Sequence, residues 1–177
     1  QPQHEAATVL QRLVALGWTV DHQHGREATR ARVTASLAQA ELLHYAGHGV
    51  HRGPSGWDGA LLLGDGDTLG VTDILALPRV PAQVVLSGCE TASITQSARA
   101  GGMNLGRAFV LAGAQWVIGA QGVVDDALAR SIGEALYAEL RPGDSVVEGA
   151  AALRRALLEA RARDPSGDWA RFRVVVP

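Results

Sequence analysis

The chain has 177 residues, of which 47% are hydrophobic, and this is enough to fill the core of one domain. Its 16 basic and 18 acidic residues give a net charge of −2, which argues against the positive field typical of nucleic-acid-binding proteins. The one cysteine cannot form an internal disulfide and no apolar run approaches the roughly 20 residues that span a bilayer. We therefore expect a cytoplasmic protein that binds neither nucleic acid nor membrane.

In the first half of the chain, short helices are predicted to alternate with strands. The helical pattern begins almost at the first residue, without an initiating methionine, so we expect residues 1–177 to be one domain excised from a longer protein. Gly17 is expected to end the first helix and Thr72 to cap the third. The predicted helices span 6–16, 27–40 and 72–77, and the predicted strands span 18–20, 41–46, 60–63, 68–71 and 83–87.

The second half continues this alternation and ends in a strand. Ser145 and Glu148 have the spacing of a capping box at the start of the last helix. The predicted helices span 102–112, 125–140 and 145–163, and the predicted strands span 115–120 and 171–176. Because several strands are continuous apolar runs between helices, we predict a three-layer α/β/α sandwich with a mostly parallel sheet and a small β-hairpin insertion at 60–71.

Two reactive side chains follow predicted strands. His48 lies between Gly47 and Gly49 just after the strand over 41–46, and Cys89 follows Gly88 after the strand over 83–87. Their separation of 41 positions leaves room for a crossover that returns the second strand parallel to the first, about 4.8 Å away. Gly49 and Gly88 are expected to let the backbone turn sharply and to leave main-chain N–H groups available to an oxyanion.

The chemistry of this pair is that of an activated thiol. A free thiol has a pKa of about 8.5, so little of it is thiolate at neutral pH without a neighbouring base. A histidine, with an ordinary pKa near ~6.5, can take the thiol proton and later return a proton to a leaving amine. Taken alone, Cys89 would more simply be a packed core thiol, and the strand-end histidine favours the catalytic interpretation.

Other histidines and acidic residues have simpler explanations. His44 is expected either to be structural or to support the reactive residues without reacting itself, with its polar atoms satisfied by backbone groups. A metal cluster of His44, His48 and His51 matches no established zinc spacing, so no metal site is expected. Asp65 and Asp67 are interpreted as hairpin turn residues rather than calcium ligands.

A substrate pocket is predicted from a few residues near the reactive pair. Asp125 and Asp126 fit the first turn of a helix best, and a carboxylate there can also line a pocket for a basic side chain. Glu90, next to Cys89, either orients the loops or contributes to the same pocket. Trp57 follows a glycine-rich loop and is a candidate cover for the cleft, whereas Trp116 is expected in the core.

Two blocks of the sequence resemble the CHAT domain, a mostly bacterial branch of the caspase-like cysteine peptidases. The stretch LLHYAGHG, at 42–49, resembles the family's strand ending in His-Gly, and LSGCETA, at 86–92, resembles its strand ending at the nucleophile. Later segments, among them GRAFVLAGAQWVIGA and VDDALA, follow the family's order, so the resemblance covers nearly the whole chain.

This resemblance implies a caspase-like fold and hydrolysis of peptide bonds through an acyl-enzyme. Cys89 would attack, His48 would act as base and then acid, and the N–H groups of Gly49 and Cys89 would form the oxyanion hole. A protein or peptide would be the substrate, and a sensor or repeat domain would regulate the activity. The resemblance implies no metal and no organic cofactor. One alternative is a catalytically silent interaction module on the same scaffold. A second is a non-peptidase hydrolase or transferase, although the chain lacks the G-x-S-x-G elbow of α/β-hydrolases.

Overall fold

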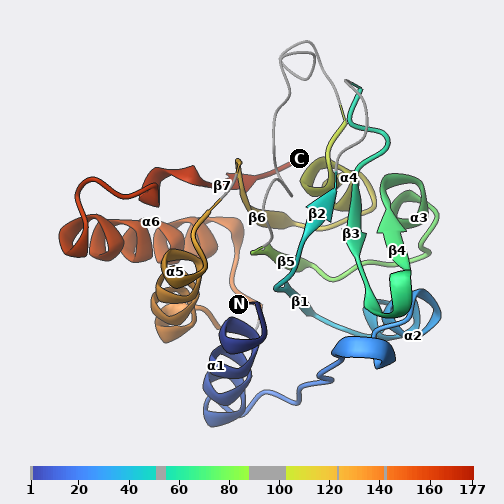
Figure 1. Cartoon of the computed structure of the whole chain (residues 1–177), viewed down its shortest axis with the longest axis horizontal. Helices are drawn as coiled ribbons and strands as arrows, with labels where there is room; N and C mark the ends of the chain where they lie inside the picture. The colour runs from blue at the N-terminus through green and yellow to red at the C-terminus, as the bar shows by residue number, and fades with distance from the viewer. Residues whose placement is uncertain (1, 51–54, 88–102, 123, 142) are drawn as a thin grey trace.

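A four-stranded sheet lies at the centre of the computed structural model, which describes residues 2–50, 55–87, 103–122, 124–141 and 143–177. The strand order is β1-β5-β6-β7 (Figure 1). The first three strands run parallel and the last is antiparallel to its neighbour, so the predicted mostly parallel sheet is confirmed. The strands are β1 (Leu42–Tyr45), β5 (Gln83–Leu86), β6 (Trp116–Ala120) and β7 (Phe172–Val175).

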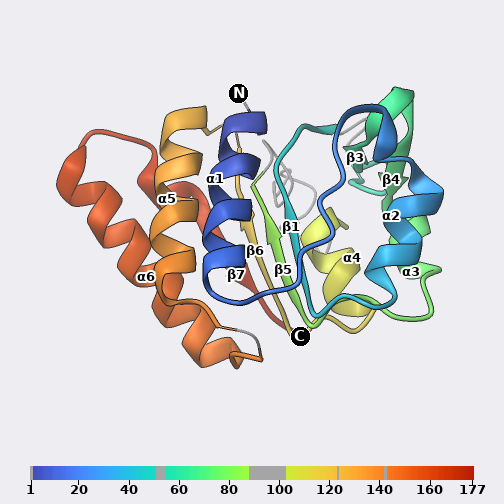
Figure 2. The ribbon, with the colours of Figure 1, turned by 90° about the horizontal axis from the view of Figure 1, so that it is seen from below.

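Helices cover both faces of this sheet, which confirms the three-layer α/β/α sandwich (Figure 2). One outer layer consists of α1 (Pro2–Ala15), α5 (Asp126–Glu139) and α6 (Val146–Arg163). The opposite layer contains α2 (Arg30–Leu37), α3 (Val71–Leu75) and α4 (Leu105–Leu111).

The sheet separates two apolar cores because successive strand residues point to opposite faces. Val85 and Ile118 belong to the core under α1, α5 and α6, whereas Val84 and Leu86 belong to the core under α3 and α4. All four residues of β5 are buried, and burial on both faces explains why Val84, Val85 and Leu86 form an unbroken apolar run. Trp116 is fully buried, as predicted.

A second sheet, in the order β2-β3-β4, lies on the side of α2 and α3. It consists of β2 (Gly49–Val50), β3 (Ala60–Leu62) and β4 (Thr68–Gly70). The antiparallel pairing of β3 with β4 confirms the predicted hairpin, and Asp65 turns its tip with φ 57°. The strand β2 was not predicted, because two residues carry no pattern of their own and become a strand only by pairing with β3.

Helix boundaries follow the capping side chains. Ser145 and Glu148 form the predicted capping box of α6. The prediction that Thr72 caps α3 is wrong. Instead the helix begins one residue earlier, and the Asp73 carboxylate accepts a 2.8 Å hydrogen bond from Gly70 N. The predicted strand over 18–20 is wrong, since this segment is irregular and its residues Trp18 and Val20 pack against the core beneath α1 instead of joining a ladder.

A polar cluster on the side of the sheet covered by α1, α5 and α6 joins β1 to α5 and α1. His44 Nδ1 on β1 lies 3.0 Å from the hydroxyl oxygen of Tyr137 on α5, and His44 Nε2 lies 3.4 Å from Glu5 Oε1 on α1. Burial, and next the charge of Glu5, raise the pKa of Tyr137, so its hydroxyl keeps a proton to donate. The partners of His44 are therefore side chains, not the backbone groups that were predicted.

We expect Tyr137→Phe to destabilise the fold by about 1–3 kcal/mol, because His44 Nδ1 would lose its partner in a buried site. Chemical denaturation followed by circular dichroism measures this change. Ser166→Ala is the matched control, since it removes an exposed hydroxyl that bonds to Asp164 and should change the free energy of unfolding much less. Equal losses for both variants would contradict the assigned partnership of Tyr137 with His44.

Candidate active site

The strands that lead to the two reactive residues lie side by side. Tyr45, the last residue of β1, is opposite Leu86, the last residue of β5, and Ser87 N donates a 2.8 Å hydrogen bond to Tyr45 O. The prediction that β5 returns parallel to and beside β1 is thus confirmed. Cys89, two residues beyond Ser87, lies outside the described residues, as do Gly88 and Glu90.

His48 lies where the chain passes from the central sheet to the second sheet. Its side chain is exposed, and its carbonyl oxygen accepts hydrogen bonds from Leu62 N and from the Tyr45 hydroxyl, each at 2.9 Å. The main chain that carries the imidazole is therefore held by β1 and by β3. The shorter β1 places His48 three residues beyond the strand, one further than expected.

Gly49 is extended rather than sharply turned, because it lies in β2 opposite Leu61. Hydrogen-bonded and non-hydrogen-bonded pairs alternate along an antiparallel ladder. Since Leu62 N donates to His48 O, the next pair is of the non-hydrogen-bonded kind. The Gly49 N–H consequently points away from β3.

The glycine that the local geometry requires is Gly47. A Cβ atom at this position would lie 2.5 Å from the Tyr45 hydroxyl oxygen and 2.6 Å from its ring carbon Cζ. Contacts this short do not occur, so a side chain at Gly47 would displace the phenol. Sequence reasoning did not identify Tyr45 as part of this site, because an aromatic residue in a strand is typical of ordinary sheet packing.

Segments that follow the two reactive residues also meet. Met103 N, at the end of the segment after Cys89, donates a 3.2 Å hydrogen bond to Ser55 O, in the segment after His48. Gly56 has φ +75°, and a Cβ atom there would lie 1.8 Å from Met103 O. The close approach of the two segments therefore depends on glycine at this position.

The predicted pocket residues have different environments. Asp125 caps α5, accepting hydrogen bonds from Ala127 N and Leu128 N, and Asp126 is the first residue of this helix, so their helix N-terminal interpretation is confirmed. Asp126 is exposed and lies close enough to His48 for the two side-chain charges to interact. Trp57 is 49% exposed in the turn before β3.

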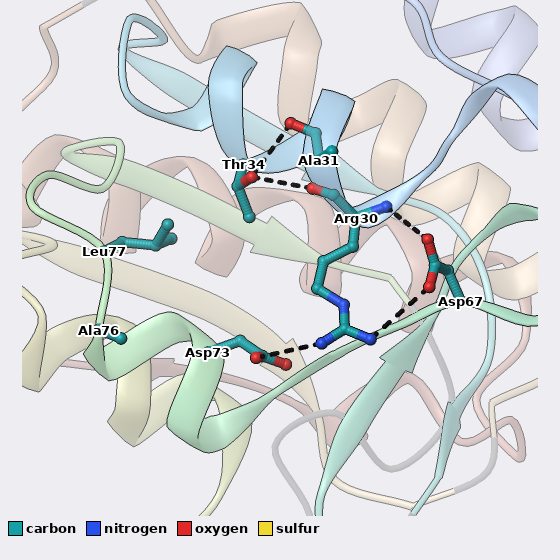
Figure 3. Close-up of a pocket in the computed structure, with 7 residues that line it drawn as sticks. All are labelled: Arg30, Ala31, Thr34, Asp67, Asp73, Ala76 and Leu77. Carbon is teal, nitrogen blue, oxygen red and sulfur yellow. Dashed lines mark hydrogen bonds and ion pairs between the residues drawn. The ribbon is translucent and has the colours of Figure 1, made fainter.

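A surface pocket lies away from these residues, between α2, α3 and β4 (Figure 3). At its rim the Arg30 guanidinium lies 3.6 Å from Asp67 Oδ1 and 3.5 Å from Asp73 Oδ1, and Arg30 N donates to Asp67 Oδ2. The carboxylates are thus already paired with Arg30 and with backbone donors. The pocket lies where α2 meets the second sheet, and neither His48 nor Asp126 lines it.

Within the described parts of the chain, no group of three or more histidine, cysteine, aspartate or glutamate side chains is arranged to hold a metal ion. Over the same residues no helix is long and apolar enough to cross a bilayer.

A model of the CHAT domain family matches residues 1–177. The chain belongs to the CHAT domain family. None of the curated proteins matches it in sequence. The family assignment agrees with the fold, because this CHAT domain has the α/β/α layers of a caspase-like protein, and the strands leading to the His-Gly pair and to the Gly-Cys pair are neighbours.

We expect Gly56→Ala to destabilise this CHAT domain more than Gly66→Ala. Both glycines have positive φ, +75° and +80°, but only Gly56 faces another main-chain atom, whereas a Cβ at Gly66 meets nothing within 4 Å. Gly66→Ala should cost about 1–2 kcal/mol from backbone strain alone. Gly56→Ala should add about 1–3 kcal/mol of overpacking. Denaturation midpoints measure both, and equal losses would show that the contact with Met103 is not tight.

Proposed function

We propose that this CHAT domain is a cysteine endopeptidase, with Cys89 as nucleophile and His48 as general base. The observation that carries the proposal is the parallel pairing of β1 with β5, because it brings the ends of the strands leading to these residues side by side. The contact of Ser55 with Met103 supports it, since it joins the segments that follow the two residues.

The proposed reaction has two half-reactions. His48 takes the Cys89 proton, and the thiolate attacks the scissile carbonyl carbon to give a tetrahedral oxyanion. The N–H groups of Gly49 and Cys89 donate to this oxyanion, a role supported by the outward direction of the Gly49 N–H. The C–N bond then breaks as His48 gives its proton to the leaving amine. Water, deprotonated by His48, hydrolyses the thioester and releases the acid and the free thiol.

The proposed substrate is a protein segment with a basic side chain near the scissile bond. Asp126 is the carboxylate proposed to line this pocket, because it is exposed and its charge interacts with that of His48. Trp57 offers an exposed aromatic surface for the substrate. Glu90 is proposed for the same pocket on its sequence position alone.

We also propose that a sensor or repeat domain regulates the activity. This part of the proposal rests on the family, in which CHAT domains are often joined to such domains.

We expect the 177-residue chain to cleave a proteome-derived peptide pool, and Cys89→Ala and His48→Ala each to lower the cleavage rate on the order of 10⁴-fold, because each removes one partner of the proton transfer. Mass spectrometry of the digests maps the cleavage sites. His22→Ala is the matched control, since His22 is exposed in the irregular segment before α2 and should leave the cleavage pattern unchanged.

Cleavage that persists in Cys89→Ala would contradict the nucleophile assignment. If the wild-type chain cleaves nothing and its thiol reacts with iodoacetamide no faster than a free thiol, the catalytically silent interaction module is the correct alternative. Faster turnover of esters than of peptides would favour a non-peptidase hydrolase.

A further inference from the structure

Tyr45 forms a bridge between the two sheets. Its hydroxyl donates one hydrogen bond shared between two carbonyl oxygens, His48 O at 2.9 Å and Leu62 O at 2.8 Å. The first acceptor is only three residues further along the chain, and the second belongs to the last residue of β3. One hydroxyl thereby holds the turn after β1 against the hairpin.

The His48 carbonyl has few hydrogen-bond donors in the part of the chain that the structure describes. Among the described residues, its carbonyl oxygen has one other hydrogen-bond donor, Leu62 N, which belongs to a residue that is 40% exposed at the end of β3. Hydrogen bonds at exposed strand ends open easily. The phenol comes from the last residue of β1, which is paired with β5, so its hydroxyl links the His48 carbonyl to the central sheet as well as to the hairpin.

The phenol is suited to this role at physiological pH. Burial raises the pKa of Tyr45 above its ordinary value, although the hydrogen bonds to Leu62 and His48 act in the opposite direction. The hydroxyl therefore stays protonated and keeps donating. Gly47, where any Cβ would meet the hydroxyl at 2.5 Å, leaves the space that the ring occupies.

We propose that Tyr45 is a positioning residue for His48, whose hydroxyl fixes the main chain from which the catalytic imidazole projects. This inference rests on the proposed function, and it adds a residue that the sequence analysis did not place in the site. Tyr45 does not exchange a proton in the reaction. It acts through His48, because a displacement of about 1 Å between reacting groups can lower a rate about 100-fold.

The proton transfer itself provides the readout. When His48 is correctly placed, Cys89 gives its proton to the imidazole and a thiolate–imidazolium pair forms at a pH well below the ~8.5 of a free thiol. Because Cys89 is the only cysteine in the chain, the rate of alkylation by iodoacetamide reports on its thiolate alone. This measurement needs no substrate and no activating partner.

The test compares the pH dependence of alkylation in the wild type, Tyr45→Phe, Tyr137→Phe and His48→Ala, at temperatures where circular dichroism shows each to be folded. Tyr45→Phe keeps the ring and removes the hydroxyl. We expect its inflection to rise by about one pH unit or more, so that alkylation below the wild-type inflection slows about tenfold. Tyr137→Phe, the other tyrosine of the chain, removes a buried hydroxyl that bonds to His44 and should leave the inflection unchanged.

The outcomes separate the positioning role from the proposed function. If the wild type and His48→Ala differ but Tyr45→Phe follows the wild type, the dyad stands and the role of Tyr45 is wrong. If Tyr45→Phe and Tyr137→Phe shift equally, the effect is loss of stability, and the role of Tyr45 is again wrong. If the wild type and His48→Ala share the inflection of a free thiol, the dyad is wrong and the role of Tyr45 falls with it.

A second variant keeps the test decisive where Tyr45→Phe folds poorly. Gly47→Ala retains the phenol but places a methyl group where the hydroxyl now lies, so it should raise the inflection in the same direction. Gly70→Ala is its matched control, because a Cβ there approaches the nearest atom, Asp73 Oδ2, at 3.4 Å. A Gly47→Ala inflection that coincides with that of Gly70→Ala would overturn the proposal.

Discussion

The parallel pairing of β1 with β5 is the constraint from which the candidate site follows. β5 is buried on both faces, so a shift of its pairing register by one residue would move Val85 into the opposite core. The packing against both helix layers would be disrupted at once. The alignment of Tyr45 with Leu86 is therefore fixed by packing, and the two strand ends are fixed with it. The loops that follow β1 and β5 can therefore vary in sequence without separating these two strands.

β1 is tied to both layers just before it delivers His48. His44 points into the layer of α1 and α5, where it meets Glu5 and Tyr137, whereas its neighbour Tyr45 reaches the second sheet. Successive residues of a strand face opposite sides, so two adjacent side chains can serve the two layers. Buried polar groups of this kind contribute more to a unique arrangement than to net stability, since their desolvation offsets most of the attraction.

The sequence predicts the features that depend on a local pattern of residues, and it fails where pairing between separate segments decides the structure. The apolar run of β5, the capping box of Ser145 and Glu148, and the placement of His48 beyond a strand all follow from residue types at fixed spacing. By contrast β2 exists only because β3 lies beside it, and the apolar residues around Trp18 serve packing rather than a ladder. The positions of Cys89 and Glu90 lie outside the described residues, so the dyad remains a prediction.

Apolar burial rather than surface charge places the second sheet. The ion pairs of Arg30 are about half exposed, and pairs of this kind contribute roughly 0–1 kcal/mol. Leu61 and Leu69, which face the core from β3 and β4, are buried almost completely and contribute about 1.5–3 kcal/mol each. The hairpin is thus a firm neighbour for His48: Leu62 N bonds to the His48 carbonyl directly, and Leu62 O is linked to it through the Tyr45 hydroxyl. A partner that displaced β3 relative to β1 would therefore act through these contacts on His48, the proposed general base.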